Sequence, residues 1–328
     1  MAGALLAGCV IGVSPAFAQT SLLNVSYDVA RDFYRDYNPL FQKYWQEKTG
    51  ETIEVKQSHA GSSKQVRSVA DGLEADVVTM NQAPDVDFLA EKGLVAKDYA
   101  RKFPNNASPY TSTMVFIVRA GNPKGLRDWP DLVKSGVQVI LPHPKNTGNG
   151  RYSYLAAWGY ALGQPGGNDG TALEFVGKLL KNAPLFASGG RDATTTFMQR
   201  KIGDVLVSFE SEAELIAKEF GKGEFDVVYP SLSILAEFPA AIVEKVVDKK
   251  GTRKEAQAYL EYLWSKDGQE NAAKNYLRPR DAEVSKKYAA QFPPIKTFTV
   301  DEVFGGWSQA SPAHFKDGGS FDQIYKSN

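Results

Sequence analysis

The sequence predicts an α/β protein with two lobes, each built on a mostly parallel sheet flanked by helices. Segments with the apolar pattern of a strand alternate with segments of helical spacing from residue 22 onward, an order that is typical of parallel sheets. The chain has 328 residues, long enough for a large core and for two lobes. A unit of strand, small-residue loop and helix also occurs three times.

The first lobe is expected to begin with a strand at residues 22–27, which stops at Asp28, a residue type that often caps a helix. Helical spacing then continues through Lys48, with Pro39 as a kink or restart and Gly50 as the residue after the helix. The next elements are expected to be a strand, a helix and a strand, at residues 53–59, 63–71 and 75–79. The carboxyl ends of these strands are where such sheets bind ligands.

The second lobe is expected to begin at a long strand, residues 111–119, which follows a polar break at residues 105–109. Its further elements are expected at residues 137–141 (strand), 171–181 (helix), 204–210 (strand) and 225–239 (the return crossing). Residues 252–275 have the pattern of two successive helices. We therefore assign residues 21–112 and 245–328 to lobe 1 and residues 113–244 to lobe 2.

Three loops of small residues lie between an expected strand and an expected helix. They are Ala60-Gly61-Ser62-Ser63, Asn146-Thr147-Gly148-Asn149-Gly150 and Ser188-Gly189-Gly190-Arg191. A helix N-terminus carries unpaired N–H groups and the positive end of the helix dipole, which suits an anion. One such loop is an ordinary turn between a strand and a helix, whereas three indicate helix ends that converge on a single small anion.

The composition is that of a globular protein without a strong charge. Lys plus Arg and Asp plus Glu number 38 each, so the formal net charge is zero, and 43% of the residues are hydrophobic. A partner such as a nucleic acid or an acidic membrane has no electrostatic footprint in this chain.

The N-terminus has the pattern of an export signal. Residues 1–18 carry no charge and end in Ala16-Phe17-Ala18, which resembles a signal-peptide cleavage site. The alternative is a lipoprotein signal at Leu6-Ala7-Gly8-Cys9, but the apolar run continues well past Cys9. Cys9 is the only cysteine, so no disulfide is expected in the exported chain. No later segment approaches the ~20 apolar residues that a membrane span needs, and the mature protein is expected to be exported and soluble.

Motifs of catalytic or metal sites are lacking. The chain has three histidines, His59, His143 and His314, and no Gly-x-Ser-x-Gly elbow. It also has no cysteine pair, His-x-x-x-His motif or nucleotide-binding loop. We therefore expect no catalysis, no metal and no cofactor.

Four residues are expected around the anion loops. His59 is either a ligand contact or, as we prefer, an imidazole with a structural role. Arg151 and Arg191 each follow the last glycine of a loop by one position, and they either neutralise the anion directly or form an ion pair with a carboxylate, which is the commoner arrangement. Ser63 has the residue type of a helix cap.

The chain resembles the periplasmic sulfate- and thiosulfate-binding proteins that serve ABC importers. The resemblance covers nearly all of the mature sequence. It rests on residues 144–159 and on the motifs LLNVSYD (22–28), QSHAGSSKQ (57–65), GNPK (121–124), GDVL (203–206), ILAE (234–237), YLRPRD (276–281) and FGGW (304–307). It implies the type II periplasmic binding protein fold, with hinge crossovers between the lobes. It also implies a monomer that closes on its anion and meets a membrane permease.

The resemblance further implies a set of uncharged donors. They are the backbone N–H of Asp28, the hydroxyl of Ser62, the hydroxyl of Thr147 with the N–H groups of Gly148 and Asn149, and the N–H of Gly190. The sulfate-type members add a tryptophan N–H where this chain has Phe209, and they usually have glycine where it has Asn149. With Ala60 and Gly190, these departures resemble the thiosulfate-preferring branch.

The chemistry of sulfate agrees with such a donor set. Sulfate at neutral pH carries no proton and needs donors only, whereas a phosphate site must also accept from a P–OH group. Hydrogen bonds to a charged acceptor contribute roughly 1.5–3 kcal/mol each. Phe209 is therefore expected to weaken sulfate binding about tenfold or more, and the soft sulfur of thiosulfate against its ring would lose less. The alternatives are a binder of molybdate or phosphate, an exported hydrolase of sulfate or phosphate esters that uses His59, and a scaffold without a ligand.

Overall fold

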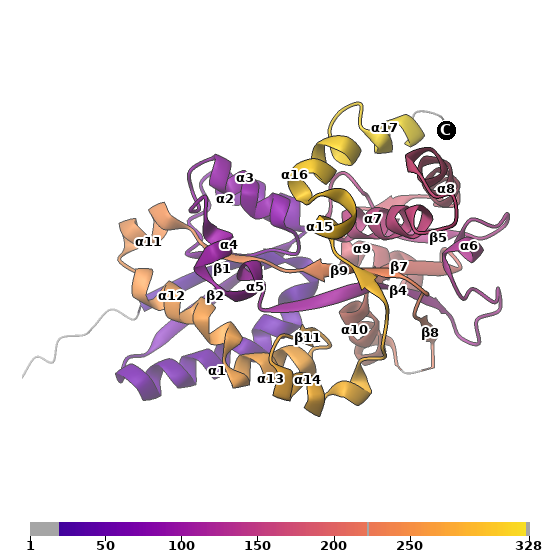
Figure 1. Cartoon of the computed structure of the whole chain (residues 1–328). Coiled ribbons are helices and arrows are strands. Elements are labelled where there is room, and N and C mark those ends of the chain that lie inside the picture. Colours follow the sequence, from indigo (N-terminus) through magenta and orange to yellow (C-terminus); the bar gives the residue numbers. More distant parts are fainter. Residues whose placement is uncertain (1–19, 222, 326–328) are drawn as a thin grey trace, which may run out of the picture.

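Two sheets carry the fold, and they lie side by side in Figure 1. In this computed structural model, residues 20–221 and 223–325 are described. The expected signal peptide, residues 1–18, and Cys9 lie outside the described residues. None of the helices in the described part of the chain is both long enough and apolar enough to cross a membrane.

The first sheet has the parallel arrangement that the sequence predicts. Its order is β10 (Ala240–Ile242), β3 (Val77–Thr79), β1 (Thr20–Tyr27) and β2 (Ile53–Ala60). β1 lies parallel to β2 and β3, pairing Tyr27 with Ala60 and Ser26 with Thr79, while β10 runs antiparallel to β3. The carboxyl ends of β1, β2 and β3 therefore meet at one edge of the sheet.

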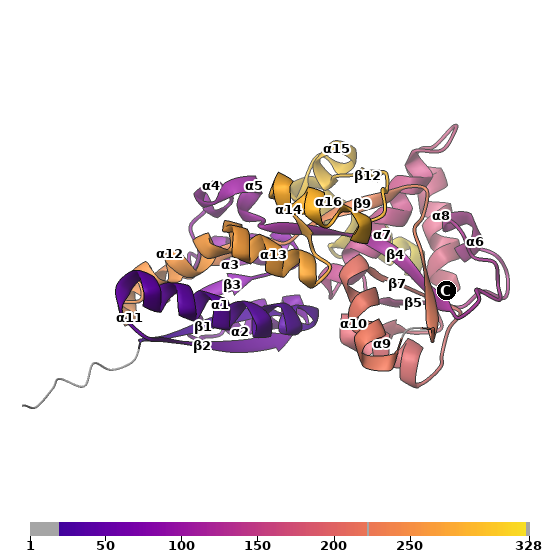
Figure 2. The ribbon, with the colours of Figure 1, turned by 90° about the horizontal axis from the view of Figure 1, so that it is seen from below.

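Helices from distant parts of the chain surround this sheet. They are α1 (Arg31–Thr49), α2 (Ser62–Ala70), α3 (Ala83–Glu91), α4 (Tyr99–Lys102), α5 (Pro104–Ala107), α11 (Glu244–Lys250), α12 (Arg253–Glu261), α13 (Lys266–Lys274) and α14 (Ala282–Lys287), with the short 3-10 helices η1 (Asp28–Ala30), η3 (Tyr262–Trp264) and η4 (Ala289–Gln291). Figure 2 shows α1 beside α13. α1 buries Phe33, Tyr37 and Phe41 on one face and ends at Gly50, whose φ is 75°. Pro39 lies inside α1 without ending it.

The second sheet is mixed because of β4 (Tyr110–Arg119). Its order is β12 (Thr297–Phe298), β9 (Ser233–Glu237), β4, β7 (Val205–Phe209), β5 (Val139–Pro142) and β6 (Phe186–Ala187), and both β8 (Phe225–Val228) and β11 (Arg278–Pro279) also pair with β4. β5 runs parallel to β6 and β7. β4 enters from the first sheet and runs antiparallel to β7, β8, β9 and β11.

The helices of the second sheet follow the strands that the sequence predicts. They are α6 (Trp129–Leu132), α7 (Gly148–Leu162), α8 (Asp169–Lys181), α9 (Gly190–Thr194), the π-helix η2 (Thr195–Gln199) and α10 (Glu210–Phe220). α7 begins shortly after β5 and is buried along almost its whole length, as expected for a helix with apolar residues on all sides. α10 begins directly after β7, above a small cluster of buried apolar side chains that includes Ile117, Leu206 and Ile216.

The C-terminal segment packs on the second sheet. It contains β12, α15 (Val300–Phe304), α16 (Trp307–Ala310), the π-helix η5 (Ser311–Phe315) and α17 (Ser320–Tyr325). β12 pairs with β9, and Figure 1 shows α17 beside α8. Aromatic rings hold the segment there, with the ring centroid of His314 4.6 Å from that of Trp158 and the centroid of Phe321 6.1 Å from that of Phe186.

This placement differs from the predicted assignment of residues 245–328 to lobe 1, because residues 297–325 lie against the second sheet. Residues 240–242, assigned to lobe 2, form β10 of the first sheet. The aromatic residues of the segment indicate only that it packs somewhere, not against which sheet. For the rest of the chain, the division into two lobes stays a prediction.

Candidate anion-binding site

A small cavity lies where the edge of the first sheet faces the helices of the second. The seven residues that the resemblance assigns to the anion all line it: Asp28, Ser62, Thr147, Gly148, Asn149, Gly190 and Phe209. Val29, Gly61, Asn81 and Gly189 complete the lining. Among these described lining residues there is no lysine and no arginine.

Helix N-termini open onto this cavity from both sheets. Ser62 is the first residue of α2, Gly148 of α7 and Gly190 of α9. The N–H groups of a first helical turn have no carbonyl partner within the helix, and in a helix of 15 residues such as α7 they also carry the positive end of the dipole. The backbone thus presents donors to the cavity without any cationic side chain.

The two hydroxyl groups that were expected to donate to the anion have partners within the protein. Ser62 Oγ donates to Asp85 Oδ2. Thr147 Oγ1 donates to the carbonyl of His143 at 3.0 Å and accepts from the N–H of Gly150 at 3.0 Å. A hydroxyl has a single proton, so in this arrangement neither group donates into the cavity. Donation by Ser62 and Thr147 to a ligand stays a prediction that requires a change of partner.

Asp85 is a buried carboxylate behind the cavity that the sequence did not single out. Besides Ser62, it accepts from Ser63 Oγ at 3.1 Å and from Gln82 Nε2 at 2.8 Å. Ser63 therefore contacts the Asp85 carboxylate and does not line the cavity itself. In the sequence, Asp85 and Gln82 are notable only because they follow β3, at the carboxyl edge of the sheet. Several polar residues share that position, so the sequence does not single out these two.

Asp28 reaches from the first sheet to α9. Its carboxylate accepts from its neighbour Val29 N–H at 3.0 Å and from the Arg191 N–H at 3.2 Å. Burial raises the pKa of Asp28, and the two N–H donors act in the opposite direction. A Cβ atom on Gly189 would lie 2.8 Å from Asp28 Oδ2, so this contact needs a glycine. The resemblance implies a role for the Asp28 backbone, whereas here its side chain also links the two sheets.

Arg191 has carboxylate partners in this structure, the arrangement that the sequence analysis prefers. Its guanidinium lies 2.5 Å from Glu219 Oε2 and 3.8 Å from Glu212 Oε1. Glu212 is fully buried, accepts from Thr194 Oγ1 at 2.7 Å, and has no hydrogen-bond partner for Oε2 within the described residues. Burial raises the pKa of Glu212 to about 7, against the effects of Thr194 and Arg191.

Arg151 does not form the ion pair that the sequence favours. No carboxylate among the described residues lies within 4.0 Å of its guanidinium. It donates instead to the carbonyl of Lys145 at 3.0 Å and to Gln82 Oε1 at 3.5 Å, and lies 5.3 Å from the Phe315 ring centre. Burial lowers the pKa of Arg151. Because Gln82 follows β3 and Arg151 lies in α7, this contact joins the two sheets beside the cavity.

Phe209 forms an apolar wall of the cavity. It is fully buried, with its ring centroid 5.3 Å from that of Phe238 and 6.0 Å from that of Tyr152, both in edge-on geometry. These rings fix its orientation, and a phenyl ring has no N–H to offer. At Phe209 the cavity therefore offers a ligand an apolar contact but no hydrogen-bond donor.

His59 is not among the residues that line the cavity. Its Nδ1 lies 3.0 Å from the carbonyl of Tyr27 and its Nε2 lies 2.6 Å from Gln57 Oε1. Burial lowers the pKa of His59, which favours the neutral imidazole. Both ring nitrogens of His59 thus face protein oxygen atoms, which supports a structural role for this imidazole and not a ligand contact.

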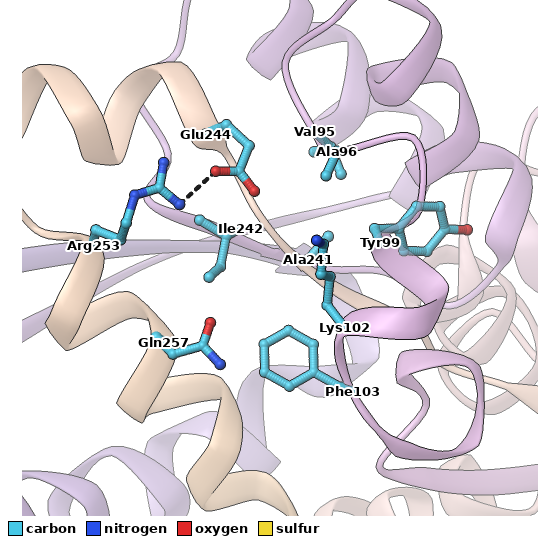
Figure 3. A pocket seen from close by; sticks show the side chains of 10 residues that line it. All are labelled: Val95, Ala96, Tyr99, Lys102, Phe103, Ala241, Ile242, Glu244, Arg253 and Gln257. Carbon is cyan, nitrogen blue, oxygen red and sulfur yellow. Dashed lines mark ion pairs between the residues drawn. The ribbon is translucent and has the colours of Figure 1, made fainter.

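A second, more open cavity lies beside the first sheet, between α4, β10 and α12 (Figure 3). Apolar side chains such as Val95, Phe103 and Ile242 line part of it. Its charged groups already have partners, since Arg253 lies 2.6 Å from Glu244 and Lys102 lies 3.1 Å from Asp98. None of the predicted site residues lies there.

Comparison with known proteins gives a consistent result. Residues 26–278 match the family model described as bacterial extracellular solute-binding protein. The thiosulfate-binding protein of Pseudomonas aeruginosa is 60% identical over 328 residues, which cover 100% of this chain and 98% of the relative. The sulfate-binding protein of Escherichia coli is 54% identical over 305 residues, or 93% of each chain.

Solved structures show the same fold. The sulfate-binding protein SubI from Mycobacterium tuberculosis superposes with a TM-score of 0.82 at 32% identity, covering 91% of this chain and 100% of that one. A periplasmic thiamin binding protein superposes with a TM-score of 0.68 at 18% identity, covering 95% of this chain and 99% of that one. At that identity the second match concerns the fold alone.

Proposed function

The chain belongs to the bacterial extracellular solute-binding proteins, and from this premise we propose that it captures sulfate or thiosulfate and delivers the anion to the permease of an ABC importer. Relatives that match almost its whole length are named thiosulfate-binding and sulfate-binding proteins. The family consists of solute-binding proteins, not enzymes. The observation that carries the proposal is one cavity lined by seven residues from distant parts of the chain, with no cationic side chain among those described.

An uncharged cage suits an anion that never carries a proton. Backbone N–H groups at the starts of α2, α7 and α9 are fixed in direction by the helices, so little reorganisation accompanies binding. Each hydrogen bond to a charged acceptor contributes roughly 1.5–3 kcal/mol, and several together offset the desolvation of a dianion. A lysine or arginine in contact with the ligand would make release to a permease slower.

Phe209 favours thiosulfate over sulfate in this proposal. The oxygen atoms of either anion need donors, and the Phe209 wall has none. The terminal sulfur of thiosulfate is large, polarisable and a weak acceptor, so contact with an aromatic ring suits it better than it suits a sulfate oxygen.

The proposal includes closure of two lobes around the anion. The chain passes between the sheets before β4, again between β9 and β10, and a third time after α13, where β11 and β12 join the second sheet. The first two passages are joined by a hydrogen bond of 2.8 Å from the Phe238 N–H to Ser108 Oγ. A change in backbone angles at these positions would open the cavity. We also infer export to the periplasm through the N-terminal signal and action as a monomer.

Calorimetric titration of the purified chain tests the proposed function. Sulfate, thiosulfate, molybdate and phosphate are titrated separately into protein that has been unfolded, dialysed and refolded to remove bound anions. We expect one site per chain and the tightest binding with thiosulfate. Binding of neither sulfur anion, or turnover of a sulfate ester by the same protein, would overturn the proposal.

A further inference from the structure

We propose that Asn81 is a specificity-determining residue of this site, whose carboxamide donates a hydrogen bond to the bound anion from the first lobe. The inference rests on the proposed function. It assigns to Asn81 the side-chain donor that is lost at the Phe209 position, where a phenyl ring stands. Asn81 follows β3 by two residues and lines the cavity beside Ser62 and Gly148.

The carboxamide of Asn81 has no partner in the described part of the protein. Asn81 is 4% exposed, its Oδ1 is buried without a hydrogen bond, and none of the hydrogen bonds found in the described residues involves its Nδ2. Leaving a buried polar group unpaired costs about 1–3 kcal/mol. Buried side-chain polar atoms in native proteins nearly always have partners. The buried unpaired atom here is the acceptor Oδ1, and a half-turn of the carboxamide exchanges Oδ1 with Nδ2 and brings its N–H donors to the same place.

The other polar side chains of the cavity are already engaged. Ser62 donates to Asp85, Thr147 donates to the His143 carbonyl, and Asn149 Nδ2 donates to Ser208 Oγ at 3.0 Å. The Asp28 carboxylate is an acceptor and repels an anion. Asn81 is therefore the cavity-lining residue whose side-chain donors are wholly uncommitted.

Asn81 also faces the start of α7, which belongs to the other side of the cavity. A Cβ atom built on Gly148 would lie 2.0 Å from Asn81 Oδ1 and 2.7 Å from its Cγ. The carboxamide thus rests against the first residue of α7, where the N–H groups of the helix start. An anion held by that helix end lies within reach of the Asn81 amide after a rotation about its terminal torsion.

The choice of an amide has a chemical consequence. Nδ2 offers two donors to a fully ionised anion, whereas a carboxylate at the same place would accept only. A carboxylate would repel sulfate and thiosulfate, but it would accept the proton of hydrogen phosphate. Residue 81 therefore discriminates between anions without a proton and anions that retain one.

Titration of Asn81→Ala and Asn81→Asp against thiosulfate, sulfate and phosphate tests this inference. We expect Asn81→Ala to bind both sulfur anions about tenfold or more weakly, since one hydrogen bond to a charged group is lost. Asn81→Asp should lose about a hundredfold or more, with a smaller loss for phosphate. Gln46→Ala, which removes an exposed carboxamide on α1 outside the cavity, is the matched control and should bind as the unaltered chain does.

The outcomes separate the two proposals. If the unaltered chain binds neither sulfur anion, the proposed function fails. If it binds them while Asn81→Ala and Asn81→Asp stay within twofold of it, the role of Asn81 is overturned. Thermal unfolding without anion shows whether each variant is folded, and the phosphate-to-thiosulfate affinity ratio of Asn81→Asp is a readout that a merely structural role would not shift.

Discussion

The two halves of the cavity are built from different kinds of group. The second sheet contributes backbone: Gly148, Asn149 and Gly190 lie at helix starts, and their positions depend on small residues. The first sheet contributes the start of α2 and, in addition, the side chains of Ser62, with its partner Asp85, and of Asn81. A backbone donor is changed only by displacing the helix, whereas a side-chain donor is changed by one substitution. We infer that the backbone donors of the second half supply affinity for any small oxyanion, and that the side chains of the first half, together with the Phe209 wall, adjust which oxyanion is preferred.

The largest effect is expected where the two halves meet. Gly148→Ala places a Cβ atom on Asn81 Oδ1, so the amide must move and the lobes close less completely. We expect about a hundredfold weaker thiosulfate binding by calorimetry. Without anion the melting temperature should hardly change, because alanine is well tolerated at the start of a helix.

Two further variants sharpen this test. Gly150→Ala would bring a Cβ atom within 2.5 Å of the Pro142 carbonyl oxygen and 2.6 Å of the His143 carbonyl oxygen. Both lie on the same side of the cavity as Gly150, so this variant should be less stable even without anion. In an Asn81→Ala background, Gly148→Ala should cost much less affinity, since the group that it strikes is gone. A full hundredfold loss in that background would contradict the contact.

Each half of the cavity has one buried carboxylate behind it, Asp85 in the first half and Glu212 in the second, and the two differ in how many hydrogen bonds they accept. Asp85 accepts from three side chains, whereas Glu212 accepts from Thr194 alone and has one oxygen without a partner among the described residues. Burial raises the pKa of Glu212 from 4.5 to about 7 in the folded state. The folded protein therefore holds this proton more tightly than the unfolded chain does. The stability that Glu212 contributes is complete below pH 4.5 and is lost as the pH rises through about 7.

Glu212→Gln should remove this dependence, because glutamine resembles the protonated acid. At pH 8 we expect the variant to be more stable than the unaltered chain, by about 3 kcal/mol. Near pH 4.5 the two should be about equally stable. Urea unfolding across this range measures the difference. A constant difference at all pH values would show that Glu212 does not titrate.

Sequence reasoning succeeded where local patterns determine the structure. The strand, loop and helix order placed β1, β2, β5 and β7 within one or two residues, and Gly148 and Gly190 begin helices as expected. It did not locate the C-terminal segment, since aromatic residues such as Phe321 do not specify which sheet they cover. It also missed Asn81 and Asp85, because their importance depends on contacts between residues that are far apart in the chain.

The hydroxyl groups show a second limit. Serine and threonine at a helix start predict a cap, and Thr147 is one, since it accepts from the Gly150 N–H. Whether the same hydroxyl also donates to a ligand depends on where its single proton goes. His143 and Asp85 take those protons in this structure, and neither acceptor is identifiable from the loops themselves.

The smallest expected effect concerns the wall rather than either set of donors. Phe209→Trp introduces an indole N–H where the present ring has none, and burial among Phe238 and Tyr152 leaves the larger ring little choice of position. Sulfate should gain one hydrogen bond and bind about tenfold more tightly. Thiosulfate should gain less, because its terminal sulfur accepts weakly, so the thiosulfate-to-sulfate affinity ratio falls. Parallel titrations measure that ratio, with Phe209→Leu as the control that changes the size of the wall without adding a donor. A ratio that is the same in Phe209→Trp and in the unaltered chain would mean that the wall does not choose between the two anions, and discrimination would then lie with the side chains of the first half alone.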